Sequence, residues 1–223
     1  MDLNSFLFFN STYYLTDYWP SKISMFSSNW VYLSYASSIR QPCNLIGIGS
    51  NLYITSDYGI YKTDFNINII SQYLNYVNYR GVAYNSTSKY IYSAVFANNQ
   101  GRRVDVFDLD LNLKISIPVS LSIYSIVMYN NSFYIGSTSG VILVMVDNNI
   151  IDSFNACNDF ISSIFFDEYG NFAATGTWYS VYVFNSLRVL NKTLTVPMWP
   201  RDIHFDNDGR LVLITQIQVS FYY

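Results

Sequence analysis

Residues 163–184 read SIFFDEYGNFAATGTWYSVYVF and contain one copy of a unit that recurs along the chain. Ser163–Phe166, Phe172–Thr175 and Val181–Phe184 are short runs rich in β-branched and aromatic residues, which is typical of β-strands. Between the first two runs lies Asp167–Asn171, whose Asp, Gly and Asn residues favour a tight turn. The segment therefore predicts three successive antiparallel strands.

The second of these runs recurs six times at a nearly constant spacing. The copies end at Thr16, Thr55, Ser93, Gly136, Thr175 and Thr215. Consecutive ends are 39, 38, 43, 39 and 40 positions apart, and a period near 40 residues built from short strands is typical of propeller blades. We therefore predict an all-β fold, a β-propeller of about six blades of roughly 40 residues each. It forms a single domain, 1–223, with repeat units at approximately 5–38, 39–78, 79–121, 122–158, 159–198 and 199–223.

The sixth unit stops soon after its third apolar run, Val219–Phe221. We therefore expect the last blade to lack its outer strand, which would leave an exposed edge that favours association. Two alternatives stay open: a ring that closes imperfectly, or a chain that is part of a longer protein in which these repeats are purely structural.

The composition excludes some classes of partner. Aromatic residues make up 19% of the chain and charged residues only 12%, with a net charge of −3 and a pI near 4.9. Broad electrostatic binding to nucleic acid needs a basic surface, so we do not expect it. No apolar run reaches about 18 residues, so no membrane span is predicted. No signal peptide is visible at the N-terminus, and localisation and oligomeric state stay open.

Residues that commonly carry catalysis are scarce. The chain has one histidine, His204, and one glutamate, Glu168. A histidine-based metal site needs several partners, and paired-carboxylate hydrolysis would rely on aspartates alone. Cys43 and Cys157 fall in different units, too far apart in a propeller for a disulfide. We therefore expect no catalytic residues, and a hydrogen-bonded structural role for His204.

Two sets of loops are expected to share one face of the propeller: those leading into the first strand of each blade, and those between second and third strands. They bring together Trp, Tyr and Arg, the side chains that commonly anchor interfaces, stack on sugar rings and bind carboxylates. The predicted ligand face comprises Arg40, Arg80, Arg201, Trp19, Trp178, Trp199, Tyr58 and Tyr179. The alternative is that the arginines pair locally with aspartates, the candidates being Asp17, Asp57, Asp159 and Asp202.

The repeat resembles two families of propellers. The Asp-x-x-Gly-Asn turn at 167–171, the second strand ending in Thr175 and the Val-x-Val-Phe strand at 181–184 resemble NHL repeats. The segment Tyr14–Asp17 resembles the YWTD motif of receptor propellers. The Pro-x-Gly that usually precedes the first strand is absent from most units, and the Asp after Thr is lost from the third unit onward. The resemblance implies a six-bladed propeller that binds proteins, glycans or RNA.

Some propellers of this kind are calcium-dependent lactonases or esterases, or lyases, and the resemblance implies a second hypothesis. Carboxylate and amide oxygens, which calcium prefers, occur near the starts of first strands at Asn44, Asn158, Asp159 and Asp202; turn capping is the alternative role for them. Our leading hypothesis is a non-enzymatic recognition or scaffold module without a cofactor that binds a protein, peptide or glycan. The alternative is a calcium-dependent hydrolase or lyase acting at the channel mouth.

Overall fold

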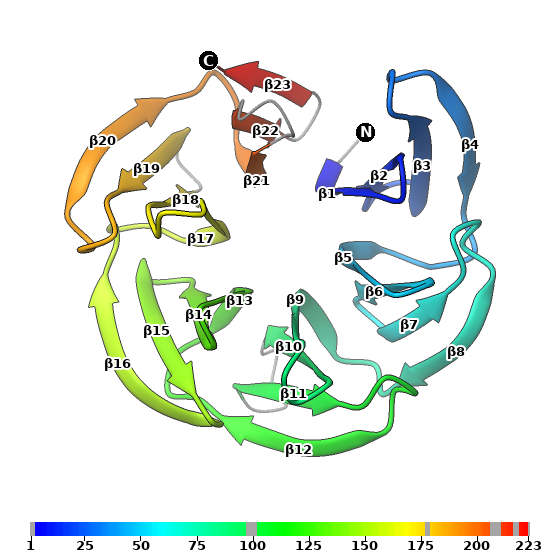
Figure 1. Ribbon diagram of the computed structural model, residues 1–223, viewed down its shortest axis with the longest axis horizontal. Helices are drawn as coiled ribbons and strands as arrows, with labels where there is room; N and C mark the ends of the chain where they lie inside the picture. Colours follow the sequence, from blue (N-terminus) through cyan, green and yellow to red (C-terminus); the bar gives the residue numbers. More distant parts are fainter. Residues whose placement is uncertain (1–2, 97–101, 177–178, 206–210, 216–218, 223) are drawn as a thin grey trace.

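The computed structural model shows β-sheets arranged in a ring (Figure 1). The innermost strands of the sheets line a central channel. The structure describes residues 3–96, 102–176, 179–205, 211–215 and 219–222. Each of the six sheets is an antiparallel meander, and the described residues contain no helix. The all-β, six-bladed propeller predicted from the repeat is confirmed.

The strands of each blade follow one another from the channel outward. The innermost strands are β1 (Leu3–Phe9), β5 (Pro42–Ile48), β9 (Asn78–Asn85), β13 (Ile123–Tyr129), β17 (Ile161–Phe166) and β21 (Pro200–Phe205). The second strands are β2 (Thr12–Asp17), β6 (Asn51–Ser56), β10 (Tyr90–Phe96), β14 (Ser132–Ser137), β18 (Phe172–Gly176) and β22 (Leu211–Thr215). The third strands are β3 (Lys22–Ser27), β7 (Gly59–Thr63), β11 (Arg103–Phe107), β15 (Val141–Val146), β19 (Ser180–Phe184) and β23 (Val219–Tyr222).

Five blades have a fourth, outer strand, and the sixth does not within the described residues. The outer strands are β4 (Tyr32–Ala36), β8 (Ile69–Leu74), β12 (Leu113–Pro118), β16 (Asn149–Asn155) and β20 (Leu190–Thr195). The expectation of a three-stranded last blade is thus confirmed, and Figure 1 shows β23 at the periphery beside the first blade.

In the first two blades, the Thr at the end of the second strand links its blade to the next one. Thr55 Oγ1 accepts a hydrogen bond from Asn44 N of its own blade (3.0 Å) and donates one to Arg80 O of the next (2.9 Å). Thr16 Oγ1 makes the equivalent bond to Cys43 O (3.1 Å). These hydroxyls are fully buried, so each satisfies backbone groups that water cannot reach. In the fifth blade, Thr175 bonds Ser162 and Ser163 of its own blade, and Ser162 Oγ donates to Pro200 O of the sixth (3.1 Å).

The fourth blade is linked to the next by a hydroxyl from a different strand. Gly136 replaces the Thr, and a Cβ at Gly136 would approach Ser125 Oγ to 2.3 Å. Ser125 Oγ occupies that space and donates to Ile161 O of the fifth blade (3.3 Å). The loss of one hydroxyl is thus compensated by another from the innermost strand.

The ring closes through a buried carboxylate on β21. Asp202 Oδ2 accepts hydrogen bonds from Ser5 Oγ (2.7 Å) and Phe6 N (3.1 Å) of the first blade. Its Oδ1 accepts one from Ser163 Oγ (2.6 Å) of the fifth. Asp202 therefore ties the sixth blade to both of its neighbours, and an apolar cluster that includes Phe6 packs across the same junction.

Candidate functional site

A β-bulge interrupts the pairing of every innermost strand with its second strand. A bulge adds a residue to one strand and redirects a side chain. Residues from all six of these irregular regions line the same small opening of the central channel, which we call the channel mouth: Asn4, Cys43, Asn44, Arg80, Tyr124, Ser162 and Arg201. Equivalent positions of the six repeats thus meet at one point with side chains of different size and charge.

The channel mouth is almost closed. Its cavity measures about 10 Å³, which is room for about one water molecule. Arg80 fills much of it: the side chain is only 10% exposed, and its Nη2 lies 2.9 Å from Asp57 Oδ1. A ligand therefore cannot pass through this end of the channel without displacing Arg80.

Aromatic rings surround the Arg80 guanidinium on several sides. Its Cζ lies 5.3 Å from the ring centre of Tyr18, 5.5 Å from that of Tyr124 and 5.8 Å from that of Phe96. Tyr18 donates a short hydrogen bond to Asp57, the partner of Arg80. Cation–π contacts gain strength when they are shielded from water, so this cluster braces four blades against one another.

The environment of the cluster shifts the pKa values of Cys43, Tyr18 and Arg80 upward. Burial raises the pKa of the Cys43 thiol to about 12, although Arg80 Nη1 lies only 3.0 Å from Cys43 Sγ. Burial and Asp57 raise the pKa of Tyr18 to about 12. For Arg80, burial lowers the pKa, but the surrounding acidic groups outweigh this effect and raise the pKa above its usual value; Cys43 and Tyr124 contribute where they are ionised, and Asp57 pairs with Arg80. At neutral pH Cys43 is a neutral thiol rather than a nucleophile.

A second group of aromatic residues on the same face is exposed. The aromatic rim comprises Trp19, Tyr58, Tyr76, Tyr179 and Trp199. These residues lie in the loops that approach the channel mouth, and four of them expose more than a third of their surface.

Cationic groups lie over several rings on this face. Arg40 is exposed, with its Cζ 4.9 Å from the Tyr58 ring centre, and Arg201 packs 4.6 Å from the Trp199 ring. Of the residues assigned to the ligand face from the sequence, Arg40, Trp19, Trp199, Tyr58 and Tyr179 lie in loops, whereas Arg80 lies within β9 and Arg201 within β21. Trp178 falls outside the described residues. Sequence reasoning missed Tyr76, in the loop between β8 and β9, whose ring contacts Tyr58.

The sequence assigned Arg40, Arg80 and Arg201 to one ligand face. Arg80 and Arg201 line the channel mouth, but from the second blade the lining residues are Cys43 and Asn44 and not Arg40. Arg40 instead lies outside, against Tyr58. Asn4 and Ser162 also line the channel mouth. Both lie at the β-bulge of an innermost strand, so a repeat alignment that allowed one extra residue there would have identified them.

Below the mouth the channel widens into a cavity of about 250 Å³ whose wall is mainly apolar. Its polar side chains include Asn44, Ser163, Asp202 and His204. His204 Nε2 lies 3.1 Å from Asp202 Oδ2, and the imidazole makes edge contacts with Phe6 and Phe165. The histidine therefore has the hydrogen-bonded position expected of it.

The order of these groups differs from that of a catalytic triad. Ser163 Oγ donates to Asp202, and His204 bonds the other oxygen of the same carboxylate. In a triad the histidine lies between the hydroxyl and the carboxylate. Here the carboxylate lies in the middle, so His204 is not placed to take the proton of Ser163.

The residues proposed as calcium ligands do not form one set. Asn44 and Asp202 both line the wide cavity, but both oxygens of Asp202 accept hydrogen bonds from neighbouring blades. Asn158 is exposed, and Asp159 lies beside Gly176. Across the described part of the chain, no three His, Cys, Asp or Glu side chains are grouped as metal ligands.

Burial by itself would raise the pKa of Asp202. His204 and the hydroxyls of Ser163 and Ser5 act in the opposite direction, and the net effect lowers it. Asp202 is therefore ionised at neutral pH. Cys43 and Cys157 are both free thiols, and within the described residues no helix is long and apolar enough to cross a bilayer.

Comparisons with known proteins identify the fold. No family model matches the chain, and no curated protein matches it. The WD40 domain of Neurospora crassa Pan2 is similar in structure, with a TM-score of 0.75 and 10% identity over 99% of this chain and 75% of that one. The computationally designed protein Ika8 has a TM-score of 0.65 and 11% identity, over 99% of this chain and 70% of that one. A six-bladed propeller is shown, while no family match supports the NHL or YWTD repeat type.

Proposed function

We propose that this propeller is a non-enzymatic recognition module that binds a protein or peptide partner across the aromatic rim. The observation that carries this proposal is the exposure of large aromatic side chains on one face. Trp19 is 58% exposed, Tyr76 73%, Tyr179 47% and Trp199 39%. Aromatic side chains offer a large contact area at low entropic cost and are enriched at binding hot spots.

The closed channel mouth favours a partner that lies across the face. Arg80 and Asp57 fill the opening and are paired with each other, so a small molecule has no deep cleft to enter there. A polypeptide, by contrast, could contact several rim residues at once. The surface then resembles an interface with aromatic anchors around a rigid centre.

The partner should combine apolar side chains with at least one carboxylate. Arg40 is exposed beside Tyr58, and a guanidinium stacked on a ring is well placed to bind a carboxylate in a bidentate manner. The formal net charge of −3 makes non-specific attraction of acidic partners weak, so specificity rests on these local contacts.

The proposal can be tested with peptides selected from a displayed random library against the wild-type protein. The double variant W19A/Y76A should weaken binding of the selected peptides at least tenfold, about 1.4 kcal/mol, and leave the melting midpoint nearly unchanged because both side chains are exposed. Affinity is measured by isothermal titration calorimetry.

The matched control is Y32A/Y35A, which removes two equally exposed rings, 50% and 58%, from the outer strand β4. Its affinity should equal that of the wild type. Selected peptides that bind W19A/Y76A as tightly as the wild type would reject the rim as the binding surface. A glycan array that yields ligands where the peptide library yields none would change the ligand class to carbohydrate.

A further inference from the structure

A five-residue turn recurs on the opposite face, between the third and outer strands of four blades. In each turn the first N–H bonds the fifth C=O, and the fourth N–H bonds the first C=O. The fourth residue has a positive φ of 61° to 64° in every case. These fourth residues are Trp30, Ile67, Leu111 and Arg188.

In the second and third blades this turn fills the seam with the preceding blade. The second and fourth residues, Phe65 and Ile67, pack into the core between the first two blades. Leu109 and Leu111 do the same between the second and third. Ile67 and Leu111 are almost fully buried. A positive φ is unfavourable for β-branched and bulky residues, so packing in the seam stabilises this conformation.

The turn of the fifth blade has the same backbone but polar side chains. Its second and fourth residues are Ser186 and Arg188. The Arg188 side chain is directed outward: Nη1 lies 2.5 Å from Asp152 Oδ2, and Cζ lies 4.8 Å from the Phe154 ring. Both of those residues belong to β16, the outer strand of the fourth blade. Arg188 therefore does not fill the seam as Ile67 and Leu111 do.

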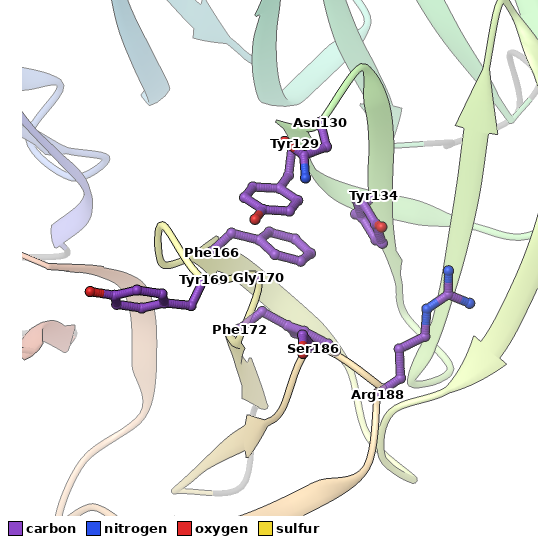
Figure 2. Close-up of a pocket in the computed structure, with 9 residues that line it drawn as sticks. All are labelled: Tyr129, Asn130, Tyr134, Phe166, Tyr169, Gly170, Phe172, Ser186 and Arg188. Carbon is purple, nitrogen blue, oxygen red and sulfur yellow. The ribbon is translucent and has the colours of Figure 1, made fainter.

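A pocket of about 250 Å³ lies at this seam. Tyr129 stacks on Phe166 with ring centres 4.6 Å apart, and Phe172 packs against Phe166 at 5.0 Å. Figure 2 shows these rings in the pocket, with Arg188 extending away from them.

Tyr134, which also lines this pocket, is the counterpart of two tyrosines at filled seams. Tyr14 Oη donates to Phe65 O and Tyr53 Oη donates to Leu109 O, each in the turn of the following blade. At the seam of the fourth and fifth blades the corresponding tyrosine faces the pocket.

We propose that this seam pocket is a second binding site, distinct from the aromatic rim, that takes an apolar side chain of leucine to tryptophan size from a peptide or protein partner. The other seams show what fits: Trp30, Ile67 and Leu111 occupy the corresponding turn position with the same backbone. The stacked rings of Tyr129 and Phe166 supply apolar surface, and Asn130, Ser186 and Arg188 supply polar groups in the lining. The charge of Arg188 is balanced by its pairing with Asp152.

The test fills the pocket with the side chains that the third blade uses. The double variant S186L/R188L reproduces the Leu109 and Leu111 pair, and Leu111 shows that leucine is accepted at this φ. Binding is measured by saturation-transfer NMR with N-acetyl-leucinamide and N-acetyl-tryptophanamide as probes, and N-acetyl-serinamide as the polar comparison. Wild type should bind the two apolar probes, and the variant should lose at least tenfold in affinity.

The matched control is S28L/K89L, which adds two leucines and removes one positive charge on the same face. Lys89 also has a positive φ, 63°, but neither position lines the pocket. Its affinity for the probes should equal that of the wild type. S186L/R188L should in addition raise the melting midpoint by about 2–4 °C, because buried leucines add apolar contacts.

Undiminished probe binding to S186L/R188L would overturn the proposal. So would binding of methyl glycosides in place of the apolar amides, or a lowered melting midpoint in S186L/R188L. If the double variant does not fold, Arg188→Leu alone provides the same comparison. Selected peptides that lose affinity in W19A/Y76A but not in S186L/R188L would support the aromatic rim and say nothing about the seam pocket. The small apolar probes test the seam pocket separately, so either proposal can be rejected while the other stands.

Discussion

Arg80 and Trp19 lie on the same face and belong to residue types that commonly anchor interfaces, yet their environments are opposite. The Arg80 side chain is 10% exposed and paired with Asp57, whereas Trp19 is 58% exposed. The first holds four blades together at the channel mouth, and the second is available to a partner. On this face, therefore, burial separates residues that stabilise the ring from the exposed residues that we propose as the binding surface.

The largest effect expected from this comparison is on stability at the channel mouth. Replacing Arg80 with Met removes the cation and leaves the Asp57 carboxylate poorly compensated, which should cost about 3–5 kcal/mol of unfolding free energy. Urea denaturation measures this. Arg40→Met, which changes an exposed arginine on the same face, should stay within about 0.5 kcal/mol of the wild type. Equal losses of unfolding free energy in Arg80→Met and Arg40→Met would contradict the distinction between a stabilising channel mouth and an exposed rim.

Asp202→Asn tests the buried carboxylate that joins the sixth blade to the first and fifth blades. Asp202→Asn weakens hydrogen bonds to an ionised acceptor and should cost about 2–3 kcal/mol at pH 7. Because its folded pKa lies below the unfolded value of about 3.9, the carboxylate's contribution is present above that value and is lost as the pH falls through the folded pKa. The variant should therefore lose part of the wild type's acid sensitivity below about pH 4.

Asp110→Asn is the control for this pH dependence, because the Asp110 side chain is 80% exposed. Unfolding free energies at pH 7 and in the acid range should match those of the wild type. An Asp202→Asn protein with unchanged stability and an unchanged acid transition would contradict the role of Asp202 in closing the ring.

Removing a threonine hydroxyl that links two blades should lower the free energy of unfolding by a smaller amount. Thr55→Val keeps the shape of the side chain but removes the hydroxyl that joins Asn44 N to Arg80 O, so about 1–2 kcal/mol should be lost. Thr87 is exposed, and Thr87→Val should be neutral. An unchanged free energy of unfolding in Thr55→Val would show that the Thr55 hydroxyl does not stabilise the contact between the second and third blades.

Adding calcium should have the smallest effect on stability. The Asp202 oxygens are engaged by hydrogen bonds from Ser5 and Ser163, so millimolar calcium should not change the melting midpoint measured by calorimetry, since a ligand raises it only by binding the native state. A rise that grows with calcium concentration and disappears in Asp202→Asn would instead support the hydrolase or lyase hypothesis.

The sequence predicted the blades well because the same local pattern is repeated in every unit. Turn residues such as Gly170 and the strand-ending threonines report directly on local structure. It did not predict which residues line the channel mouth, because each innermost strand contains a bulge that simple counting omits. Arg80 and Arg201, assigned from the sequence to the ligand face, line the mouth, whereas Arg40 lies against Tyr58 and the second blade contributes Cys43 and Asn44.

Contacts between blades could not be predicted from one repeat at a time. Asp57 was among the possible partners of the arginines, but its pairing with Arg80 depends on how two blades are set against each other. The same holds for the seam pocket. Arg188 and Leu111 have the same backbone conformation, and only the three-dimensional structure shows that one fills its seam while the other turns toward β16.

The most direct test of the central claim is hydrogen exchange of the protein with and without a selected peptide. The account predicts that protection appears in the loops that contain the aromatic rim, which join β2 to β3, β6 to β7, β8 to β9, β18 to β19 and β20 to β21. Protection confined to the turn at Ser186–Arg188, or to the outer strands, would contradict recognition by the rim.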